Sequence, residues 1–413
     1  MKRKGLVLIA FAGLTAAGMP AFCEGYRTEV GSGADAITII VVKGTPYEMG
    51  HAWGSLMKDE TAACLRAYLA KGQEEGGPIT TDERLDAAWA SVSPYTDQRF
   101  KDELRGVADG AEIPLELLIR AHMLPVVTPY ACSGVCVWGE ATANGNLYQI
   151  RNLDFTIDAG LQDYPVVVIY LPDEGIPHAS PTFPGCVGAN AGLNAEGIAL
   201  SEKGASPADD LPYDIDGEHF TTFFRDILYE AHSLDEAVAI VQNAKRFKKY
   251  RYWIGDGKGK KAVKMRAYAP ELLIWADNDP TDEVAPNVVP NAVYYTMNNE
   301  LAFAHLTQNW GTYDEERMID LSRGLATDDG NLLNVVYDAS ALKMWVSYAQ
   351  GSIVASKRTY VPIDLNDYLT YDPTAPGVTA VTDAPSGGSR IVPGLILAFP
   401  VLLLIGVGVW RFK

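Results

Sequence analysis

The chain of 413 residues carries 34 lysines and arginines against 52 aspartates and glutamates, a formal net charge of −18 at pH 7. This acidic balance argues against nucleic acid or an anionic membrane surface as the main partner, because like charges repel. Hydrophobic residues make up 48% of the sequence, which is enough for a sizeable core and excludes global disorder.

The two ends of the chain predict its location. Lys2, Arg3 and Lys4 precede an apolar stretch, so residues 1–23 are interpreted as a secretory signal peptide. At the other end, residues 391–410 carry no charge and are long enough to cross a bilayer as a helix. A buried globular helix is the alternative for that stretch.

Between the body of the protein and this apolar stretch, residues 372–390 are rich in Pro, Gly, Ser and Thr, which predicts a flexible linker. Arg411 and Lys413 follow the apolar stretch and favour a cytoplasmic tail at residues 411–413. The expected molecule is an extracellular domain tethered to the cell membrane by a single C-terminal helix.

Residues 24–131 are predicted to form a mostly helical N-terminal segment. It opens with a strand at residues 36–43, and Pro125 is expected to end its last helix. The predicted helices are residues 46–71, 81–93, 100–110 and 114–123.

Residues 132–371 change character and alternate predicted strands with a few helices, which favours an α+β fold of stacked layers. The strands are expected at residues 132–140, 147–155, 166–171, 198–202, 251–254, 261–267, 272–276, 292–297, 344–348 and 358–364. The helices are expected at residues 216–229, 235–244 and 314–325.

The most informative motif lies where the strands begin. Cys132 opens an apolar strand, and an Asn144-Gly145 turn, typical of a hairpin, leads into a second strand with Arg151 and Asp154. A thiol, a guanidinium and a carboxylate would then meet at one end of two paired strands. Such an arrangement on rigid elements is suited to a nucleophile.

Cys132 and Cys136 would share one face of a strand about 13 Å apart, too far for a disulfide; on a helix they would be neighbours. Val135, Val137 and Trp138 favour the strand. Two small buried hydrophobic residues are the plainer interpretation of both thiols. The five cysteines form no Cys-x-x-Cys and the six histidines are scattered, so no metal or cofactor is expected.

The run Cys-Ser-x-x-x-x-Trp-Gly-Glu-Ala-Thr from Cys132, followed by Arg-Asn-Leu-Asp-Phe from Arg151, resembles the core motif of the acyl-coenzyme A:6-aminopenicillanic-acid acyltransferase family. These are N-terminal-nucleophile (Ntn) hydrolases, with acid ceramidase, bile-salt hydrolase and penicillin V acylase as more distant relatives. Weaker likenesses extend the resemblance over about residues 40–370, at residues 44–50, 192–199, 296–299 and 345–369.

The resemblance implies an Ntn αββα four-layer sandwich and self-cleavage between Ala131 and Cys132. Cys132 would become a chain terminus and the nucleophile. Its α-amino group, with a pKa of about 7.7–8.0, would act as the base and would be oriented by Asp154. The resemblance further implies that Arg151 holds substrate or supports the amine. Asn298 would donate to the oxyanion, and Arg317 would pair with this cluster.

Each of these residues has a local interpretation as well. Arg151 and Asp154 could form an ion pair that closes the hairpin, Asn298 could cap the following turn, and Arg317 could lie on a solvated helix face. Asn299 stands where the family has His, and Asn298 and Asn299 remain alternatives for the functional asparagine.

Two functions follow from the sequence. The first is a membrane-anchored extracellular hydrolase or acyltransferase acting on a small amide or N-acyl substrate, with a lysophospholipase-like esterase as a variant. The second is a catalytically inactive relative that serves as a cell-surface binding or structural module. An intact Cys132 with Arg151 and Asp154 favours the first.

Overall fold

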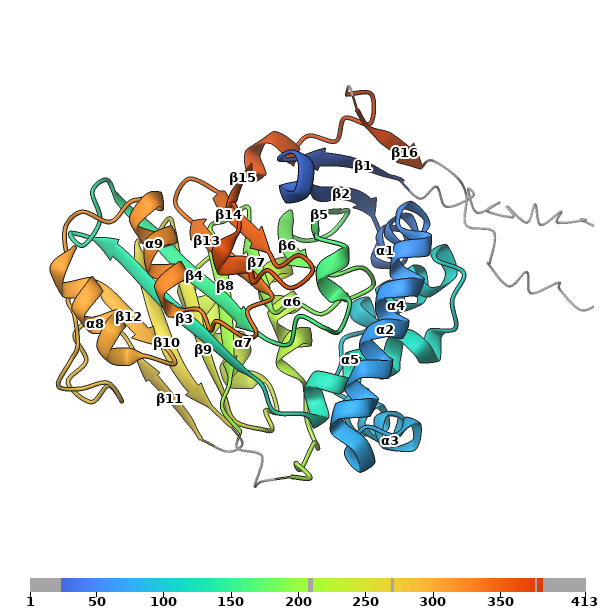
Figure 1. Cartoon of the computed structure of the whole chain (residues 1–413), viewed down its shortest axis with the longest axis horizontal. Helices are drawn as coiled ribbons and strands as arrows, with labels where there is room; N and C mark the ends of the chain where they lie inside the picture. The colour runs from blue at the N-terminus through green and yellow to red at the C-terminus, as the bar shows by residue number, and fades with distance from the viewer. Residues whose placement is uncertain (1–23, 207–210, 269–270, 376, 382–413) are drawn as a thin grey trace, which may run out of the picture.

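The computed structural model describes residues 24–206, 211–268, 271–375 and 377–381 (Figure 1). The described residues form a ten-stranded and a six-stranded sheet. The strands are β1 (Glu24–Val30), β2 (Ile37–Gly44), β3 (Ala131–Gly139), β4 (Gly145–Asp154), β5 (Val166–Pro172), β6 (His178–Thr182), β7 (Ala191–Asn194), β8 (Ile198–Gly204), β9 (Tyr250–Asp256), β10 (Lys261–Ala267), β11 (Leu272–Trp275), β12 (Ala292–Tyr295), β13 (Leu333–Asp338), β14 (Lys343–Tyr348), β15 (Val361–Asp364) and β16 (Thr379–Val381).

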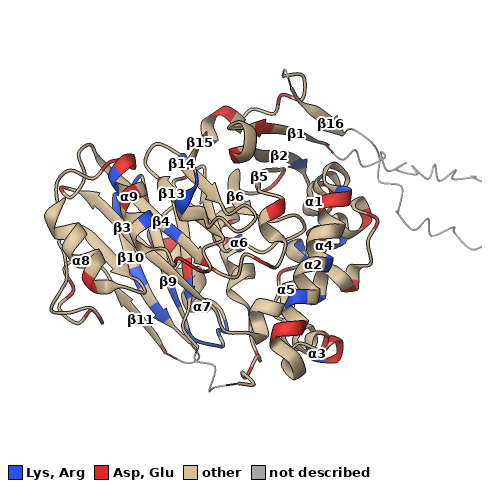
Figure 2. Cartoon of the chain, viewed as in Figure 1, with Lys and Arg blue, Asp and Glu red and all other residues tan. Residues whose placement is uncertain are grey.

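Helices cover the outer faces of both sheets. They are α1 (Pro46–Leu56), α2 (Lys58–Gly76), α3 (Asp82–Val92), α4 (Gln98–Gly110), α5 (Leu115–Val127), α6 (Phe220–Glu230), α7 (Leu234–Asn243), α8 (Asn299–Gln308) and α9 (Glu315–Leu325). In the view of Figure 2, acidic and basic residues are interspersed over these elements, with acidic residues on α1 and α3.

The two sheets stack face to face around one apolar core. The ten-stranded sheet runs β11-β10-β9-β8-β7-β6-β5-β2-β1-β16, and the six-stranded sheet runs β12-β3-β4-β13-β14-β15. Ile39 and Val167 of the first sheet and Cys136 and Val335 of the second belong to the buried cluster between them. Alternate residues of each strand point outward, which gives each sheet a second apolar face to cover.

The helices pack on these outer faces. Ile40 and Val168 pack against α1 and α4, while Leu200 packs against α6 and α7. On the other side of the molecule, Val135 and Val336 pack beneath α8 and α9. The chain therefore has the α+β character that the sequence predicted and the four-layer order that the resemblance implied.

The N-terminal segment is an integral part of this fold. Strand β2 pairs in parallel with β5 and in antiparallel with β1. Helices α1 and α4 approach closely because Gly50 and Gly106 lie where they cross; an added Cβ at Gly106 would lie 2.2 Å from the carbonyl oxygen of Tyr47. Residues 24–131 thus supply two strands of the larger sheet as well as the predicted helices.

Several element predictions need correction. The helix expected at residues 46–71 is two helices, because the chain breaks at Met57 (φ −132°, ψ 40°). Helix α5 does not stop before Pro125 but continues to Val127. The sequence patterns also did not predict β1, β6, β13 or α8.

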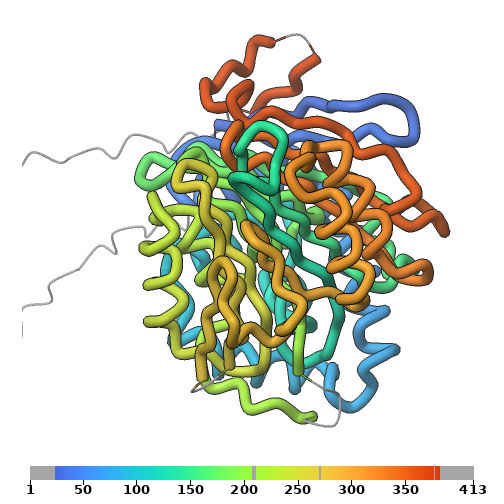
Figure 3. The backbone as a smooth tube through the Cα atoms, turned by 90° about the vertical axis from the view of Figure 1, so that its left-hand side faces the viewer, coloured from blue at the N-terminus to red at the C-terminus, as the bar shows by residue number. Residues whose placement is uncertain are grey.

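The chain ends bear on the tethering prediction. Part of the expected linker, residues 379–381, is strand β16 and pairs with β1 (Figures 1 and 3). The predicted signal peptide (residues 1–23) and membrane helix (residues 391–410) lie outside the described residues. Within the described part of the chain, no helix has the length and apolarity needed to cross a bilayer.

Candidate active site

Cys132 lies near the start of β3 and faces the core between the two sheets, where it is fully buried. Strand β3 pairs with β4 in antiparallel register, with Cys132 opposite Leu153 and Gly134 opposite Arg151. Cys136 lies on the same face of the strand. The predicted strand is confirmed, and all four cysteines in the described residues are free thiols.

Arg151 is fully buried and forms an ion pair with Glu202 of β8, not with Asp154. Its Nη2 lies 2.6 Å from Oε1 of Glu202, and its Nε donates to the carbonyl oxygen of Asn190 at 3.0 Å. The same Oε1 of Glu202 lies 3.9 Å from Sγ of Cys132. Glu202 therefore joins the thiol to the guanidinium.

The surroundings of Cys132 hold its thiol in the neutral form. Burial raises the pKa of Cys132 to about 12; Arg151 and Lys203 oppose this shift, and the carboxylates of Glu202 and Asp154 add to it. Burial also raises the pKa of Glu202, against the effect of Arg151. A carboxylate of raised pKa beside a neutral thiol is suited to take the thiol proton.

Asp154 ends β4 directly opposite Ala131, the residue before Cys132. Its Oδ1 accepts hydrogen bonds from the backbone and hydroxyl of Thr327 and from the amide of Asn331. Its Oδ2 is buried and has no hydrogen-bond partner among the described residues. A buried acceptor without a partner is costly, and the residue that carries this one pairs with Ala131 across the two strands.

The two predicted asparagines serve the local turn. Oδ1 of Asn298 accepts from the backbone of Leu301 at 3.0 Å and caps α8, and Oδ1 of Asn299 accepts from the backbone of Thr296 at 2.8 Å. The ammonium of Lys203 donates to the sulfur of the neighbouring Met297 and to the carbonyl oxygen of Cys132. The segment thus lies near Cys132, while the side chain of Asn298 acts as a helix cap.

The prediction that Arg317 pairs with the cluster is wrong. Arg317 lies in the first turn of α9, is exposed, and donates to Oδ1 of Asn309 at 3.0 Å. Helix α9 covers the outer face of the six-stranded sheet, whereas Cys132 points to the inner face. The local interpretation from the sequence, a solvated helix face, agrees with this position.

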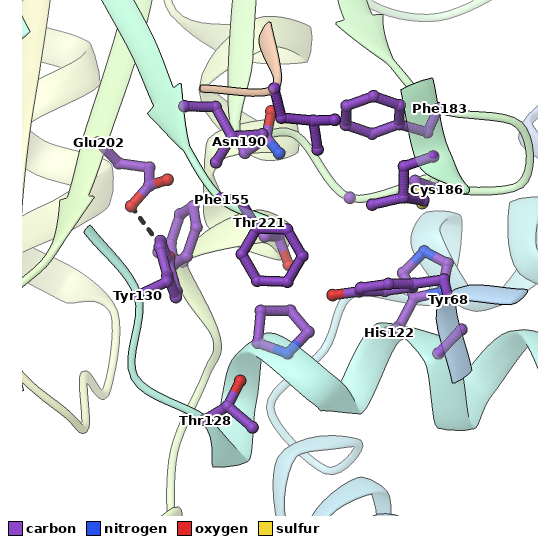
Figure 4. Close-up of a pocket in the computed structure, with 17 residues that line it drawn as sticks. Tyr68, His122, Thr128, Tyr130, Phe155, Phe183, Cys186, Asn190, Glu202 and Thr221 are labelled. Atoms are coloured by element: carbon purple, nitrogen blue, oxygen red, sulfur yellow. Dashed lines mark hydrogen bonds between the residues drawn. The ribbon is translucent and has the colours of Figure 1, made fainter. Parts of the chain in front are cut away.

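A cavity that is open to solvent lies beside this cluster. Its walls are largely apolar and aromatic, and Phe220 from α6 is one of the lining residues. Figure 4 labels Tyr68 from α2, Phe155 after β4 and Phe183 after β6 in the same lining. Such a lining suits an apolar group of a small ligand. Residues from both sides of the Ala131–Cys132 bond contribute to the walls.

The polar end of the cavity meets the cluster. Glu202 lines it, and the hydroxyl of Tyr130 donates to Oε2 of Glu202 at 2.9 Å (Figure 4). Asn190 also lines the cavity, and its buried Oδ1 has no partner among the described residues. The cavity therefore offers polar groups only a short way from Cys132.

The sequence patterns did not indicate Glu202, Asn190 or Tyr130 as site residues. Glu202 and Lys203 end the apolar strand β8, and charged residues at the end of a buried strand are a signal that could have been used. Asn190 and Tyr130 carry no comparable signal. Within the described residues, no group of three or more His, Cys, Asp or Glu side chains could hold a metal ion.

The chain is similar to two proteins of Dictyostelium discoideum. Protein dcd1B is 27% identical over 368 residues, which cover 79% of this chain and 71% of that protein. Protein dcd1A is 27% identical over 400 residues, which cover 83% of this chain and 88% of that protein. No family model matches the chain.

Solved structures of low similarity align with parts of the chain. A Caenorhabditis elegans ortholog of N-acylethanolamine-hydrolyzing acid amidase is 16% identical with a TM-score of 0.39, and the match covers 51% of this chain and 93% of that one. Penicillin V acylase from Agrobacterium tumefaciens is 14% identical with a TM-score of 0.37, covering 60% and 90% of the two chains.

Proposed function

We propose that the chain is an Ntn-type cysteine hydrolase or acyltransferase that cleaves itself between Ala131 and Cys132. The observation that carries this proposal is the buried, unpartnered Oδ2 of Asp154 opposite Ala131. An amine released at Cys132 would satisfy this acceptor. The thiol of the same residue lies beside Glu202 and Arg151.

The cleavage step follows from these neighbours. The Cys132 thiol gives its proton to Glu202 and attacks the carbonyl carbon of Ala131. The C–N bond breaks, the amine of Cys132 takes a proton, and Ala131 becomes a thioester on the cysteine sulfur. Water then hydrolyses the thioester, which yields the carboxylate of Ala131 and the free thiol.

After cleavage, the α-amino group of Cys132 replaces the carboxylate as the base. Its pKa of about 7.7–8.0 lets it take the thiol proton near neutral pH. The thiolate attacks an amide carbonyl of the substrate, the amine of the substrate leaves with a proton, and an acyl-enzyme remains. Water or an acceptor amine then removes the acyl group.

The cavity supports a small substrate with an apolar acyl part. Its aromatic walls fit the acyl group, and its polar end at Glu202 and Asn190 lies toward Cys132. Because α2 and α5 of the N-terminal segment line the cavity, both pieces must stay together for it to persist.

The proposed location is the outer face of the cell membrane. It rests on the basic and apolar start of the chain and on the uncharged residues 391–410, followed by Arg411 and Lys413. Expression of the full chain in intact cells, with protease added outside, tests it: the body of an extracellular domain is digested without lysis. Protection until lysis would contradict it.

Intact mass and N-terminal sequencing of the purified protein, beside Cys132→Ala, test self-cleavage. The expected result is a fragment that begins Cys132-Ser133-Gly134, with a single uncut chain in the variant. The cleaved protein is then assayed with N-acyl amino acids, other N-acyl amides and lysolipids of one acyl chain. A single uncut chain in both samples would overturn the proposal and favour the inactive binding module.

A further inference from the structure

Lys248 lies in the segment between α7 and β9, and its ammonium is buried against the end of α5. Its Nζ donates to the carbonyl oxygen of Pro125 at 2.7 Å and to that of Thr128 at 2.5 Å. Only 8% of the residue is exposed. A lysine of the body of the protein thus binds the segment that leads to the cleavage point.

The two carbonyl oxygens belong to a helix end that needs partners. The last carbonyl groups of an α-helix accept no hydrogen bond from within the helix, and a cation there interacts favourably with the helix dipole. Because α5 continues past Pro125, Lys248 binds the last turn just before the chain enters β3. Taken by themselves, these two contacts are those of an ordinary helix cap.

The segment has a second anchor at its other end. The hydroxyl of Tyr130 donates to Oε2 of Glu202, and Pro125, Thr128 and Tyr130 all line the cavity. Two anchors therefore fix the short stretch between α5 and the Ala131–Cys132 bond. The second anchor is the carboxylate that lies 3.9 Å from the Cys132 sulfur.

The groups that face Lys248 come from several elements. Its ammonium lies 4.8 Å from the ring centroid of Tyr213 and 5.4 Å from those of Tyr130 and Tyr250. Glu202 and His219 are the other titratable groups that interact with it electrostatically. The amino group is thus held by carbonyl oxygens and aromatic faces, and it also interacts electrostatically with Glu202.

We propose that Lys248 is a positioning residue for self-cleavage, which holds the carboxyl end of α5 so that the Ala131–Cys132 peptide lies beside Glu202. This inference rests on the proposed function. A shift of about 1 Å in a reacting group costs on the order of a hundredfold in rate, so loss of the anchor slows the attack on Ala131.

The first test compares the rate at which the Cys132 fragment forms in three variants, followed by intact mass. Lys248→Met is expected to slow cleavage on the order of a hundredfold, and Lys248→Arg, which keeps a charged donor, to restore most of the rate. Lys245→Met is the matched control, since Lys245 is exposed and pairs with Asp216. Equal rates in wild type and Lys248→Met would overturn the inference.

The second test does not depend on cleavage. In the Cys132→Ala background, Lys248→Met is expected to raise the rate of amide hydrogen exchange at residues 126–131 at least about tenfold. Lys248→Arg in the same background is expected to exchange at a rate close to that of Cys132→Ala alone. Unchanged exchange there overturns the inference, even if the wild-type chain proves uncut and the proposed function fails. If Lys248→Met does not fold, Lys248→Gln replaces it in both tests.

Discussion

The guanidinium of Arg151 lies 2.6 Å from the carboxylate of Glu202, and both side chains are shielded from solvent. Removing one member of a buried pair leaves the other charge without compensation. Glu202→Gln is therefore expected to lower the free energy of unfolding by about 3–5 kcal/mol, measured by urea denaturation. It should also slow self-cleavage, because the carboxylate beside the thiol is lost.

The control for this prediction is the surface pair of Lys258 with Glu196. Lys258→Met is expected to change stability by no more than about 1 kcal/mol, because exposed ion pairs contribute little. If Glu202→Gln and Lys258→Met lowered the free energy of unfolding by the same small amount, the charge of Arg151 would not need that of Glu202 to stay buried in the folded chain.

The hairpin that carries the site could be predicted from the sequence alone. The exact register was not predicted, because a bulge between Val137 and Gly139 shifts it by one residue before Ala131 meets Asp154. The two strands themselves are rich in β-forming residues, and Asn144-Gly145 marks the point where the second strand begins. These are local signals. They required no knowledge of which strands become neighbours in the folded protein.

Glu202 could not be predicted in the same way, because its contact with Arg151 joins strands from two different sheets. Strand β13 was missed for a related reason: Asn334 interrupts its apolar pattern, and Tyr360, which accepts from that amide, meets it only in the folded chain. The expected stop at Pro125 failed because Lys248 and the packing of Val126 support the last turn of α5.

Asp154→Asn tests the acceptor role of Oδ2. The amide oxygen of the new side chain can still accept from Thr327 and Asn331, so the fold should lose no more than about 1 kcal/mol. The new NH₂ group cannot accept the amine of Cys132, and turnover is expected to fall on the order of a hundredfold. Steady-state kinetics beside a thermal melt measures both. Full activity in the folded variant would contradict the role.

The two pieces are expected to stay together after cleavage. Strands β2 and β5 pair along seven residue positions across the cut, and the buried Glu103 of α4 lies 2.6 Å from Arg225 of α6. Both fragments should co-elute in size-exclusion chromatography. Glu103→Ala should lower stability by about 3–5 kcal/mol, because it leaves a buried guanidinium unpaired. Separate elution of wild-type fragments would refute this.

A matched control is an exposed ion pair within the N-terminal segment. Lys58 and Glu112 form an ion pair at 2.6 Å with both side chains largely exposed. Lys58→Met should change stability by no more than about 1 kcal/mol and leave the fragments together. An effect as large as that of Glu103→Ala would mean that burial of the Glu103–Arg225 pair is not what sets its contribution.

The pH dependence of stability tests the surroundings of Lys248. Burial lowers the pKa of Lys248 from 10.5 to about 7. Between pH 7 and 10 the unfolded chain therefore binds a proton that the folded chain does not, so the free energy of unfolding rises with pH through this group. The free energy of unfolding of wild type should therefore rise, relative to that of Lys248→Met, by at most about 1.4 kcal/mol per pH unit in that window.

Urea denaturation of wild type and Lys248→Met at pH 6, 7.5 and 9 measures this difference directly. Below pH 7 the difference should be nearly constant, because Lys248 is protonated in both states of the wild-type chain. Lys248→Arg should show no such window, since a guanidinium keeps its proton throughout. A difference between wild type and Lys248→Met that did not change with pH would mean that Lys248 is solvated as in the unfolded chain, and its bonds to Pro125 and Thr128 would then not persist in solution.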